Sequence, residues 1–377
     1  MFPRIALAVC LATSLVWAQP ANSPTTPRRA KNVILLLADA GGIPVVNAAS
    51  ILGYNAPQKL FIQSWDHIGL SDTSPVGKWV TDSAAGMTAI VTGQKTANGV
   101  ISQSADGKRG EADGKPLKTI LEYAEEHGLS TGVMSNVSIA DATPAACYAH
   151  QNERGNWGQI FAQLFDPKFG DGVDVVFGNG RKRIWDLAGK VNVDLDALAK
   201  GAGRTVYSRL EDVPASENRA IAVYDSGIDL RAAARIAIQK LSKNPKGFFL
   251  MIESDAHTDQ PKAGITRLLE FDKLIREISE LTNPEETLLL FTADHSFDFR
   301  VAGGGPDQPI TTGLEEWEAQ TPEVRKQGLR IPAIRMNNSH TGEEVLVAAK
   351  GPGAELVRGF MPNTQLFQIM MSAYGWR

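Results

Sequence analysis

The chain has 377 residues, of which 43% are hydrophobic, and its formal net charge is −4. This length and composition are sufficient for a large buried core. The sequence has no long basic run, which argues against a nucleic acid partner, because binding to a phosphate backbone requires clustered Lys and Arg. Only one of the two cysteines, Cys147, lies outside the N-terminal segment, so an internal disulfide in the mature chain is excluded.

The N-terminal segment, residues 1–18, has the features of a secretory signal peptide. Arg4 precedes an apolar run that ends near Trp17 and is too short to span a bilayer comfortably, and Ala18 completes a cleavage-site spacing. The alternative is an uncleaved N-terminal anchor. Residues 19–30, rich in Pro, Ser and Thr, are predicted to be a flexible lead-in. We therefore expect an exported protein, periplasmic or secreted, without a stable membrane anchor once the signal is removed.

Strand-like apolar runs alternate with amphipathic helical stretches along the rest of the chain. Predicted strands cover 32–39, 129–137, 173–180, 247–254, 287–295 and 343–351, and predicted helices cover 116–128, 155–165, 229–244, 263–281 and 364–375. Such alternation is typical of an α/β fold with a mostly parallel central sheet covered by helices on both faces. The sequence shows neither an internal repeat nor a convincing linker, so we predict one domain over residues 31–377.

Three of the predicted strands end in side chains that bind metals. Asp39 ends the run NVILLLAD, Glu253 follows GFFLMI, and Asp294 and His295 follow TLLLFTA. Each of these alone is as well explained by a solvated loop acid or a helix cap. Because the carboxyl ends of parallel strands meet at one edge of a sheet, where ligands bind, we expect the four side chains to converge.

The stretch Val80–Gly93, VTDSAAGMTAIVTG, consists almost entirely of small residues. One interpretation is an ordinary helix start, because Thr81, Asp82 and Ser83 all favour the N-cap. The other is a nucleophilic serine, Ser83, at a helix N-terminus that favours an anion such as phosphate. A serine hydroxyl is a weak nucleophile and needs activation.

Three histidines, His257, His295 and His340, lie near acids or in Ser/Thr/Gly loops. Imidazole and carboxylate ligands together suit zinc. Carboxylates and histidines around a hydroxyl form the arrangement that two-metal catalysis requires, in which one cation activates the nucleophile and the other stabilises the leaving oxygen.

Taken together, these motifs resemble the alkaline phosphatase family over most of the mature chain, and the resemblance implies the three-layer sandwich of that family. Asp82-Ser83 resembles its nucleophile motif, which implies that Ser83 is phosphorylated. The segment DATPAACYAHQNER (141–154) is similar to one that carries an acid, a threonine and, thirteen residues beyond the acid, an arginine. It implies Thr143 on magnesium, Asp141 beside or on that ion, and Arg154 on the phosphate.

The resemblance also implies metal ligands at two zinc sites and one magnesium site. Asp39 would bridge the second zinc and the magnesium, Glu253 would bind magnesium, Asp294 and His295 the second zinc, and His340 the first. Five pieces of the family pattern occur in the family's order along the chain, and this shared order makes the resemblance specific. They are Asp39, Asp82-Ser83, the segment 141–154, Asp294-His295 in TADH, and His340 in SHTG.

The segment MIESDAHTDQPKAG (251–264) departs from the family pattern. The family usually places an aspartate five residues after the magnesium glutamate and a histidine four residues further, but Thr258 and Lys262 stand there in this chain. The replacements available are Asp255, His257 and Asp259. We favour Asp255 and His257 for the first zinc, because Asp259 precedes Gln260-Pro261 and is a suitable cap for the next helix.

The function that the resemblance implies is hydrolysis of phosphate monoesters through a covalent phosphoserine at Ser83. Two alternatives remain open: a phosphodiesterase or sulfatase-like hydrolase of the same superfamily, and a relative that binds phosphate or metal with impaired catalysis. Relatives with a similar core are often homodimers, and the short interval from His295 to His340 omits decorations found in some of them. A homodimer and a monomer are both open for this chain.

Overall fold

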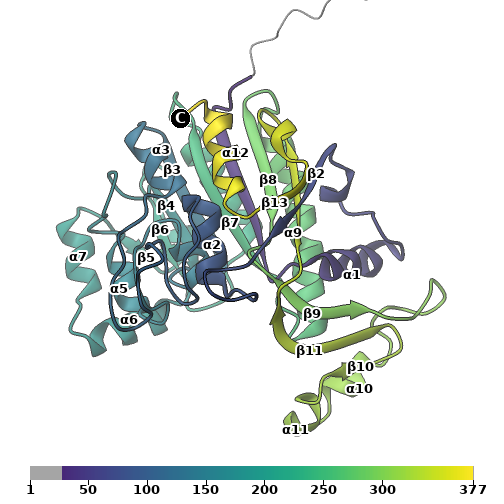
Figure 1. Cartoon of the computed structure of the whole chain (residues 1–377). Coiled ribbons are helices and arrows are strands. Elements are labelled where there is room, and N and C mark those ends of the chain that lie inside the picture. The colour runs from purple at the N-terminus through teal and green to yellow at the C-terminus, as the bar shows by residue number, and fades with distance from the viewer. Residues whose placement is uncertain (1–27, 377) are drawn as a thin grey trace, which may run out of the picture.

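The computed structural model describes residues 28–376, so the predicted signal peptide and residues 19–27 of the lead-in lie outside the described part. The prediction of an α/β fold is confirmed. A ten-stranded sheet forms the centre of the molecule (Figure 1), in the order β13-β2-β12-β8-β1-β7-β3-β4-β6-β5. Its strands are β1 (Asn32–Asp39), β2 (His67–Asp72), β3 (Ser130–Ser138), β4 (Val175–Asn179), β5 (Val206–Tyr207), β6 (Ile221–Val223), β7 (Phe248–Asp255), β8 (Thr287–Thr292), β12 (Val345–Lys350) and β13 (Gly359–Pro362).

The sheet is mostly parallel, as predicted. Strand β12 runs antiparallel to both of its neighbours, β8 and β2, while all other adjacent strand pairs are parallel. The central strands are fully buried. In β1, Val33, Leu35 and Leu37 face one apolar core, whereas Ile34 and Leu36 face the other. A continuous apolar run is therefore needed here, because alternate residues cover opposite faces of the sheet.

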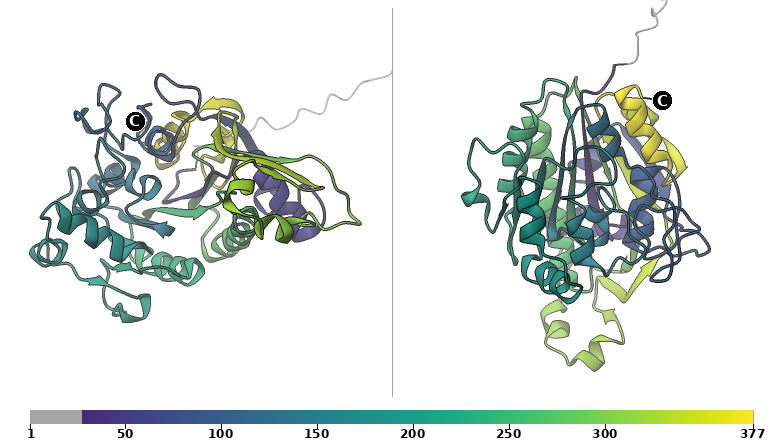
Figure 2. Two further views of the ribbon diagram at one scale, coloured as in Figure 1. Left: turned by 90° about the horizontal axis from the view of Figure 1, so that it is seen from below. Right: turned by 90° about the vertical axis from the view of Figure 1, so that its left-hand side faces the viewer.

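Helices cover both faces of the sheet (Figure 2, right). The helices of the chain are α1 (Ile43–Tyr54), α2 (Ser83–Thr92), α3 (Ile120–Glu126), α4 (Ala142–Ala145), α5 (Trp157–Ala162), α6 (Arg181–Lys190), α7 (Leu195–Gly201), α8 (Leu230–Leu241), α9 (Pro261–Leu281), α10 (Leu314–Glu318), α11 (Pro322–Arg325) and α12 (Gln365–Tyr374). Helices α2, α3, α5, α6 and α12 contribute to one core, and α1, α8 and α9 contribute to the other.

The helix predicted over 116–128 is shorter than expected because a capping box sets its start. Thr119 accepts a hydrogen bond from the backbone N–H of Glu122 at 3.2 Å, and the Glu122 carboxylate accepts one from the N–H of Thr119 at 2.8 Å. The helix therefore begins at Ile120. It ends before Gly128, whose φ of 74° is the left-handed conformation expected after a helix.

A second, three-stranded antiparallel sheet projects from the main body (Figure 1). It contains β9 (Ser296–Val301), β10 (Leu329–Arg330) and β11 (Ile334–Thr341) in the order β10-β11-β9, and the segment between β9 and β10 carries α10 and α11. His295 and His340 lie where this lobe joins the central sheet. Among the helices within residues 28–376, none has the length and apolar character that a bilayer crossing demands. The single domain over 31–377 stays a prediction.

Candidate active site

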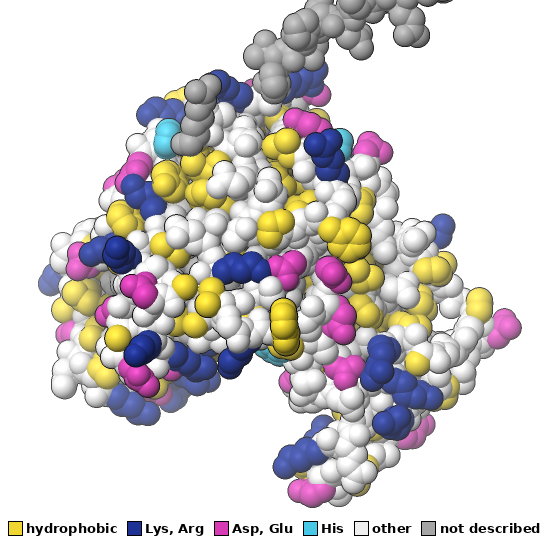
Figure 3. All heavy atoms as spheres, viewed as in Figure 1, with side chains coloured by type: hydrophobic (Ala, Val, Ile, Leu, Met, Phe, Trp, Pro, Cys, Tyr) yellow, Lys and Arg dark blue, Asp and Glu magenta, His cyan; other side chains and the backbone are white. Residues whose placement is uncertain are grey.

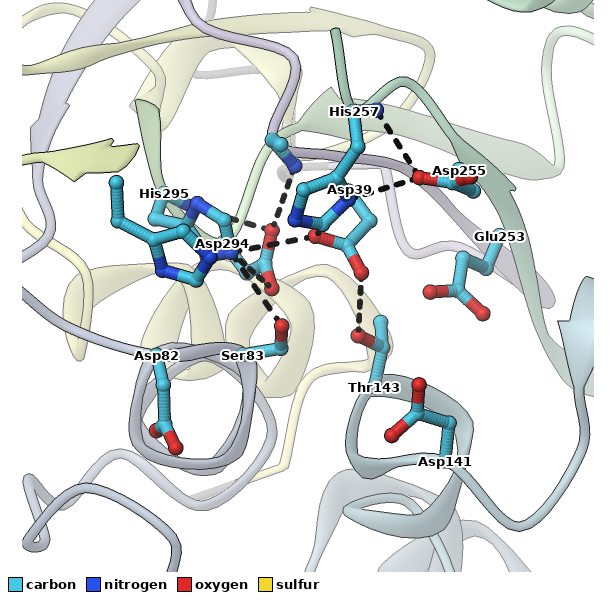
Figure 4. A network of polar contacts seen from close by, with 12 residues as sticks. Asp39, Asp82, Ser83, Asp141, Thr143, Glu253, Asp255, His257, Asp294 and His295 are labelled. Atoms are coloured by element: carbon cyan, nitrogen blue, oxygen red, sulfur yellow. Dashed lines mark hydrogen bonds and ion pairs between the residues drawn. The ribbon is translucent and has the colours of Figure 1, made fainter. Parts of the chain in front are cut away.

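The strand ends that carry the predicted ligands lie side by side. Strands β8, β1 and β7 are neighbours in the sheet, and Asp39 is directly opposite Asp255, while Thr292 is opposite Leu37. Their carboxyl ends therefore reach the same edge. Figure 4 shows the acids and imidazoles from these strands pointing toward one another, as the sequence predicted.

The turn after β1 fixes the position of Asp39. Ala40 has a φ of 61°, which is uncommon for a residue with a Cβ, and its N–H donates a hydrogen bond to Asp294 Oδ1 at 3.3 Å. After this turn the chain passes close to the segment that follows β8: a Cβ at Gly42 would lie 2.1 Å from Ser296 Oγ. The β1 and β8 ends are thereby held against each other.

Helix α2 brings Ser83 to this edge, and its small residues explain how. Ser83 is the first residue of the helix, and the side chain of Asp82 caps it by accepting from the N–H of Ala85 at 3.1 Å. A Cβ at Gly86 would lie 2.5 Å from the carbonyl oxygen of Asp294. Only a helix start without side-chain bulk approaches the end of β8 this closely. Both interpretations of Val80–Gly93 are thus compatible with the structure.

The Ser83 hydroxyl points toward the cluster of acids and imidazoles. Its Oγ lies 3.3 Å from Nε2 of His295, and the residue is 2% exposed. In Figure 4 it lies on the same side as Asp294 and His295, at the N-terminus of α2. The hydroxyl is therefore not packed into the apolar core.

The three predicted histidines converge, and in all three the protein engages the same ring nitrogen, Nδ1. The Nδ1 atoms of His257, His295 and His340 lie 2.8 Å from Asp255 Oδ1, 3.0 Å from the carbonyl oxygen of Ser296 and 3.0 Å from that of Thr81, respectively. Because each of these partners is an acceptor, Nδ1 carries the hydrogen in the neutral form of each ring, and a neutral ring then offers the lone pair of Nε2. The imidazoles come within metal-ligand range of one another, with ligand atoms no more than 4.8 Å apart.

Several buried carboxylate oxygens at this edge accept no hydrogen bond. They are Oδ1 of Asp39, Oε1 of Glu253 and Oδ2 of Asp294. Asp39, Asp294 and His295 also form a group within metal-ligand range. His295 Nε2 lies 3.3 Å from the Asp39 oxygen and 3.7 Å from the Asp294 oxygen, so a charged imidazole is nearby compensation for both, whereas Glu253 Oε1 has none among the described contacts. Buried carboxylates are costly unless a cation or a proton compensates them. The donor set of hard oxygens and imidazole nitrogens fits divalent metal ions.

The pKa shifts reflect this crowding of charge. Burial and the nearby Asp39 raise the pKa of Asp294 to about 6, and the same two causes raise that of Glu253 well above its ordinary value. Burial opposes the charged form of His257, but Asp39 and Asp255 raise its pKa to about 9. Burial and the neighbouring His295 lower the pKa of His340 to about 4. Burial opposes ionisation of Asp39 as well, but His257 and His295 beside it hold its pKa well below the ordinary value. Glu253, which has no such cationic neighbour among the described residues, is the acid that burial keeps protonated.

The residues predicted for magnesium lie on the other side of Asp39. Thr143, in the short helix α4, donates a hydrogen bond to Asp39 Oδ2 at 3.4 Å. Glu253 accepts one from Ser135 Oγ at 2.5 Å, because Ser135 is its partner on the adjacent strand β3. Asp141 caps α4 by accepting from the N–H of Ala142 at 2.7 Å. Figure 4 shows Glu253, Thr143 and Asp141 together on this side.

Arg154 is held by two carboxylates that flank the site. Its Nη1 is 3.3 Å from Asp82 Oδ2, and its Nη2 is 3.0 Å from Asp141 Oδ1. Burial disfavours its charged form, but these two carboxylates raise its pKa above the ordinary value. The guanidinium is therefore cationic, oriented and only 22% exposed beside the nucleophile's helix. In Figure 3 the surface is hollowed between the main body and the projecting lobe, with a histidine visible at the edge of the hollow.

The divergent segment 251–264 contributes His257 to the cluster, whereas Asp259 is exposed. Asp255 reaches His257 and also forms an ion pair with Arg267, whose Nη2 lies 2.9 Å from Asp255 Oδ2. Neither Arg267 nor Ser135 was predicted from the sequence as a residue of the site. Ser135 could have been found by aligning the strand pair β3 and β7, but nothing in the sequence pairs Arg267 with Asp255.

A family model described as "Alkaline phosphatase" matches residues 30–210 and 212–328. The chain belongs to the alkaline phosphatase family. Its enzyme class is accordingly that of the phosphoric monoester hydrolases, and the family prediction from the sequence is confirmed.

Individual relatives cover nearly the whole chain. The tissue-nonspecific alkaline phosphatase isozyme of Homo sapiens is 25% identical over 444 residues, which cover 91% of this chain and 83% of the relative. Streptomycin-6-phosphate phosphatase of Streptomyces griseus is 28% identical over 434 residues, covering 96% of this chain and 94% of the relative. The alkaline phosphatase from the Antarctic bacterium TAB5 has a similar structure, with a TM-score of 0.75 and 24% identity, covering 93% of this chain and all of that one. The similarity to the Antarctic structure supports the three-layer fold.

Proposed function

We propose that this alkaline phosphatase family member hydrolyses phosphate monoesters through a covalent phosphoserine at Ser83, with two zinc ions and one magnesium ion. The observation that carries the proposal is the position of the Ser83 hydroxyl, 3.3 Å from His295 Nε2 and beside the buried carboxylates of Asp39 and Asp294, which lie 3.3 Å and 3.7 Å from the same nitrogen. A hydroxyl that served only as a helix start would gain nothing from facing such a cluster.

The ligand groups follow from which atoms are free. Asp39, Asp294 and His295 would hold the second zinc, and His257 and His340 would present Nε2 to the first. Asp39, Thr143, Glu253 and Asp141 would surround magnesium, with Asp141 also orienting Arg154. A variant of the Antarctic enzyme, 25% identical to this chain, has been solved with magnesium in its M3 site. When bound, the cations would lower the pKa of the nucleophile and stabilise developing charge on the leaving oxygen.

The protein residues then have separable tasks. The Ser83 hydroxyl loses its proton to solvent and Oγ attacks phosphorus, so that an oxygen–phosphorus bond forms while the bond to the leaving alkoxide breaks, and the alkoxide takes up a proton from water. The N-terminus of α2 favours the anionic phosphoryl group at this position. Arg154 would bind two non-bridging oxygens with its planar fork, and Asp82 and Asp141 preset its orientation. Water then cleaves the phosphoserine, which releases phosphate and restores the hydroxyl.

Initial rates on a matched set of substrates test the proposal. Wild-type enzyme, Ser83→Ala and Arg154→Ala would be assayed on an aryl phosphate monoester, the corresponding diester and the aryl sulfate. We expect the monoester to be preferred and Ser83→Ala to be the more damaging variant. Loss of one oriented electrostatic contact at Arg154 should lower the rate by about 10²–10³. A higher rate on the diester or the sulfate would favour the alternative hydrolases, and wild-type turnover in Ser83→Ala would refute the covalent mechanism.

We further propose that the chain is exported and cleaved after Ala18. N-terminal sequencing of the mature protein tests this, and a mature chain that still begins at Met1 would contradict it. The homodimer stays a prediction that the molar mass in solution tests.

A further inference from the structure

Both oxygens of the Asp255 carboxylate are already engaged by protein groups. Oδ1 lies 2.8 Å from Nδ1 of His257 and accepts the backbone N–H of the same residue at 3.0 Å. Oδ2 lies 2.9 Å from Nη2 of Arg267. In Figure 4 the Asp255 carboxylate lies beyond the His257 ring as seen from His295 and Asp294. A carboxylate placed in this way faces the imidazole that it supports.

Arg267 fastens this arrangement from helix α9. Its Nε donates to the carbonyl oxygen of Asp255 at 2.6 Å, and its Nη2 donates to that of His257 at 3.1 Å. The helix comes close enough because Gly264 lacks a side chain: a Cβ there would lie 2.2 Å from the carbonyl oxygen of His257. Arg267 therefore holds the divergent segment 251–264 at two of its backbone carbonyls and at the Asp255 carboxylate.

The engaged Nδ1 determines which atom of His257 can bind a metal. With Asp255 accepting its Nδ1–H, His257 offers Nε2, and His340 does the same because the carbonyl of Thr81 accepts its Nδ1–H. Among the residues described, His257 belongs to a group within metal-ligand range, whereas Asp255 belongs to none. Because its oxygens lie outside that group, the Asp255 carboxylate would have to move away from its present position to bind the same ion directly.

We propose that Asp255 is a positioning residue for His257 and not a metal ligand, so that the first metal site of this chain is built from the imidazoles of His257 and His340 without a carboxylate. This inference rests on the proposed function and replaces the sequence-based expectation that Asp255 binds the first zinc. A site with imidazole ligands alone carries less negative charge than one with an aspartate, and it favours zinc over magnesium or manganese.

Zinc binding to the metal-free, full-length protein separates the two roles of Asp255. Stoichiometry would be measured by elemental analysis and affinity by calorimetric titration with zinc ions. The variants are Asp255→Asn, Asp255→Ala and His257→Ala, with Asp259→Asn as a matched control, because Asp259 is an exposed acid of the same loop. An amide oxygen at residue 255 still accepts the Nδ1–H bond but is a poor zinc ligand, so the asparagine variant distinguishes orientation from ligation.

We expect Asp255→Asn to keep the wild-type number of zinc ions with less than about tenfold loss of affinity at the weakest site. Asp255→Ala should lose about 10–100-fold, as is usual for groups that orient a ligand. His257→Ala should lose one zinc ion, and Asp259→Asn should match wild type. The proposal is overturned if Asp255→Asn loses one zinc ion as His257→Ala does, or if Asp255→Ala binds zinc as wild type does.

These outcomes differ from a failure of the proposed function. Wild-type protein that binds no zinc would refute the metal-dependent mechanism together with this inference. Two zinc ions in wild type with one lost in Asp255→Asn would refute this inference alone. The Nδ1–H resonance of His257 provides a readout that does not depend on turnover: it should persist in Asp255→Asn and exchange rapidly in Asp255→Ala.

Discussion

Replacing Gly86 by alanine tests whether the close approach of α2 to the end of β8, which its small residues allow, positions the Ser83 hydroxyl. The added Cβ would lie 2.5 Å from the carbonyl oxygen of Asp294 and 3.2 Å from its carbonyl carbon, both backbone atoms. The contact must lengthen by about 0.9 Å to reach an ordinary 3.4 Å. Helix α2 and the end of β8 must then separate, which displaces Ser83 from His295.

The expected loss in rate is large for a single methyl group. A misplacement of about 1 Å can lower a rate about 10²-fold, so we expect kcat on an aryl phosphate to fall by roughly that factor. Overpacking should destabilise the fold by about 1–3 kcal/mol, of which the better helix propensity of alanine offsets about 1 kcal/mol.

Gly189→Ala is the matched control. Gly189 lies inside α6 and a Cβ there would meet nothing within 4 Å, so the control should raise the free energy of unfolding by about 0.5–1 kcal/mol and leave kcat unchanged. The two variants would be compared by steady-state kinetics and thermal unfolding. If Gly86→Ala retains wild-type kcat and is stabilised as the control is, the close approach of α2 to β8 does not position the nucleophile.

Three further predictions concern charge and metal. Arg154→Lys should lower kcat/KM for a monoester by at least about tenfold, because an ammonium group cannot form the two-pronged contact, and a value equal to wild type would contradict the role of the fork. Glu125 has a pKa raised to about 8 by burial, from 4.5. Its contribution to stability is therefore complete below pH 4.5 and is lost as pH rises through 8. Glu125→Gln should consequently be the more stable protein at pH 9, by an amount of order 5 kcal/mol, and similar to wild type at pH 4.5; denaturant titrations at both pH values check this. Chelation should abolish turnover, and zinc at 100–1,000 times its Kd should restore it and stabilise the fold by about 3–4 kcal/mol, whereas a turnover unaffected by chelation would refute the metal requirement.

Much of the site could be predicted because it depends on local signals at strand ends. An acid after a buried apolar run predicts its own position at the sheet edge, as Asp39, Glu253 and Asp294 illustrate. The hydroxyl at a helix start made Ser83 a candidate, but the residues alone left an ordinary helix cap as the alternative, and the nucleophile role was implied only by the family resemblance. Predicting the strand-end acids requires only the pattern of apolar residues along the chain and the rule that the carboxyl ends of parallel strands meet at one edge of the sheet.

The remaining features depend on contacts between distant segments. The need for glycine at residue 86 exists only because β8 ends beside α2, and the partner of Asp255 is an arginine on the following helix. The antiparallel direction of β12 and the projecting lobe likewise follow from tertiary packing. Asp255 shows the limit most clearly: an acid and a histidine two residues apart have the composition of a metal site, but the ion pair with Arg267 decides which way the carboxylate faces.

Trapping the enzyme during turnover tests the covalent mechanism most directly. The wild-type protein would be mixed with an aryl phosphate, quenched in acid and digested, and the peptides mapped by mass spectrometry. We expect a phosphoryl group on the peptide that contains Ser83, and none in Ser83→Ala treated in the same way. Phosphate on another residue, or turnover with no trapped phosphoprotein at any time point together with full activity in Ser83→Ala, would contradict the account.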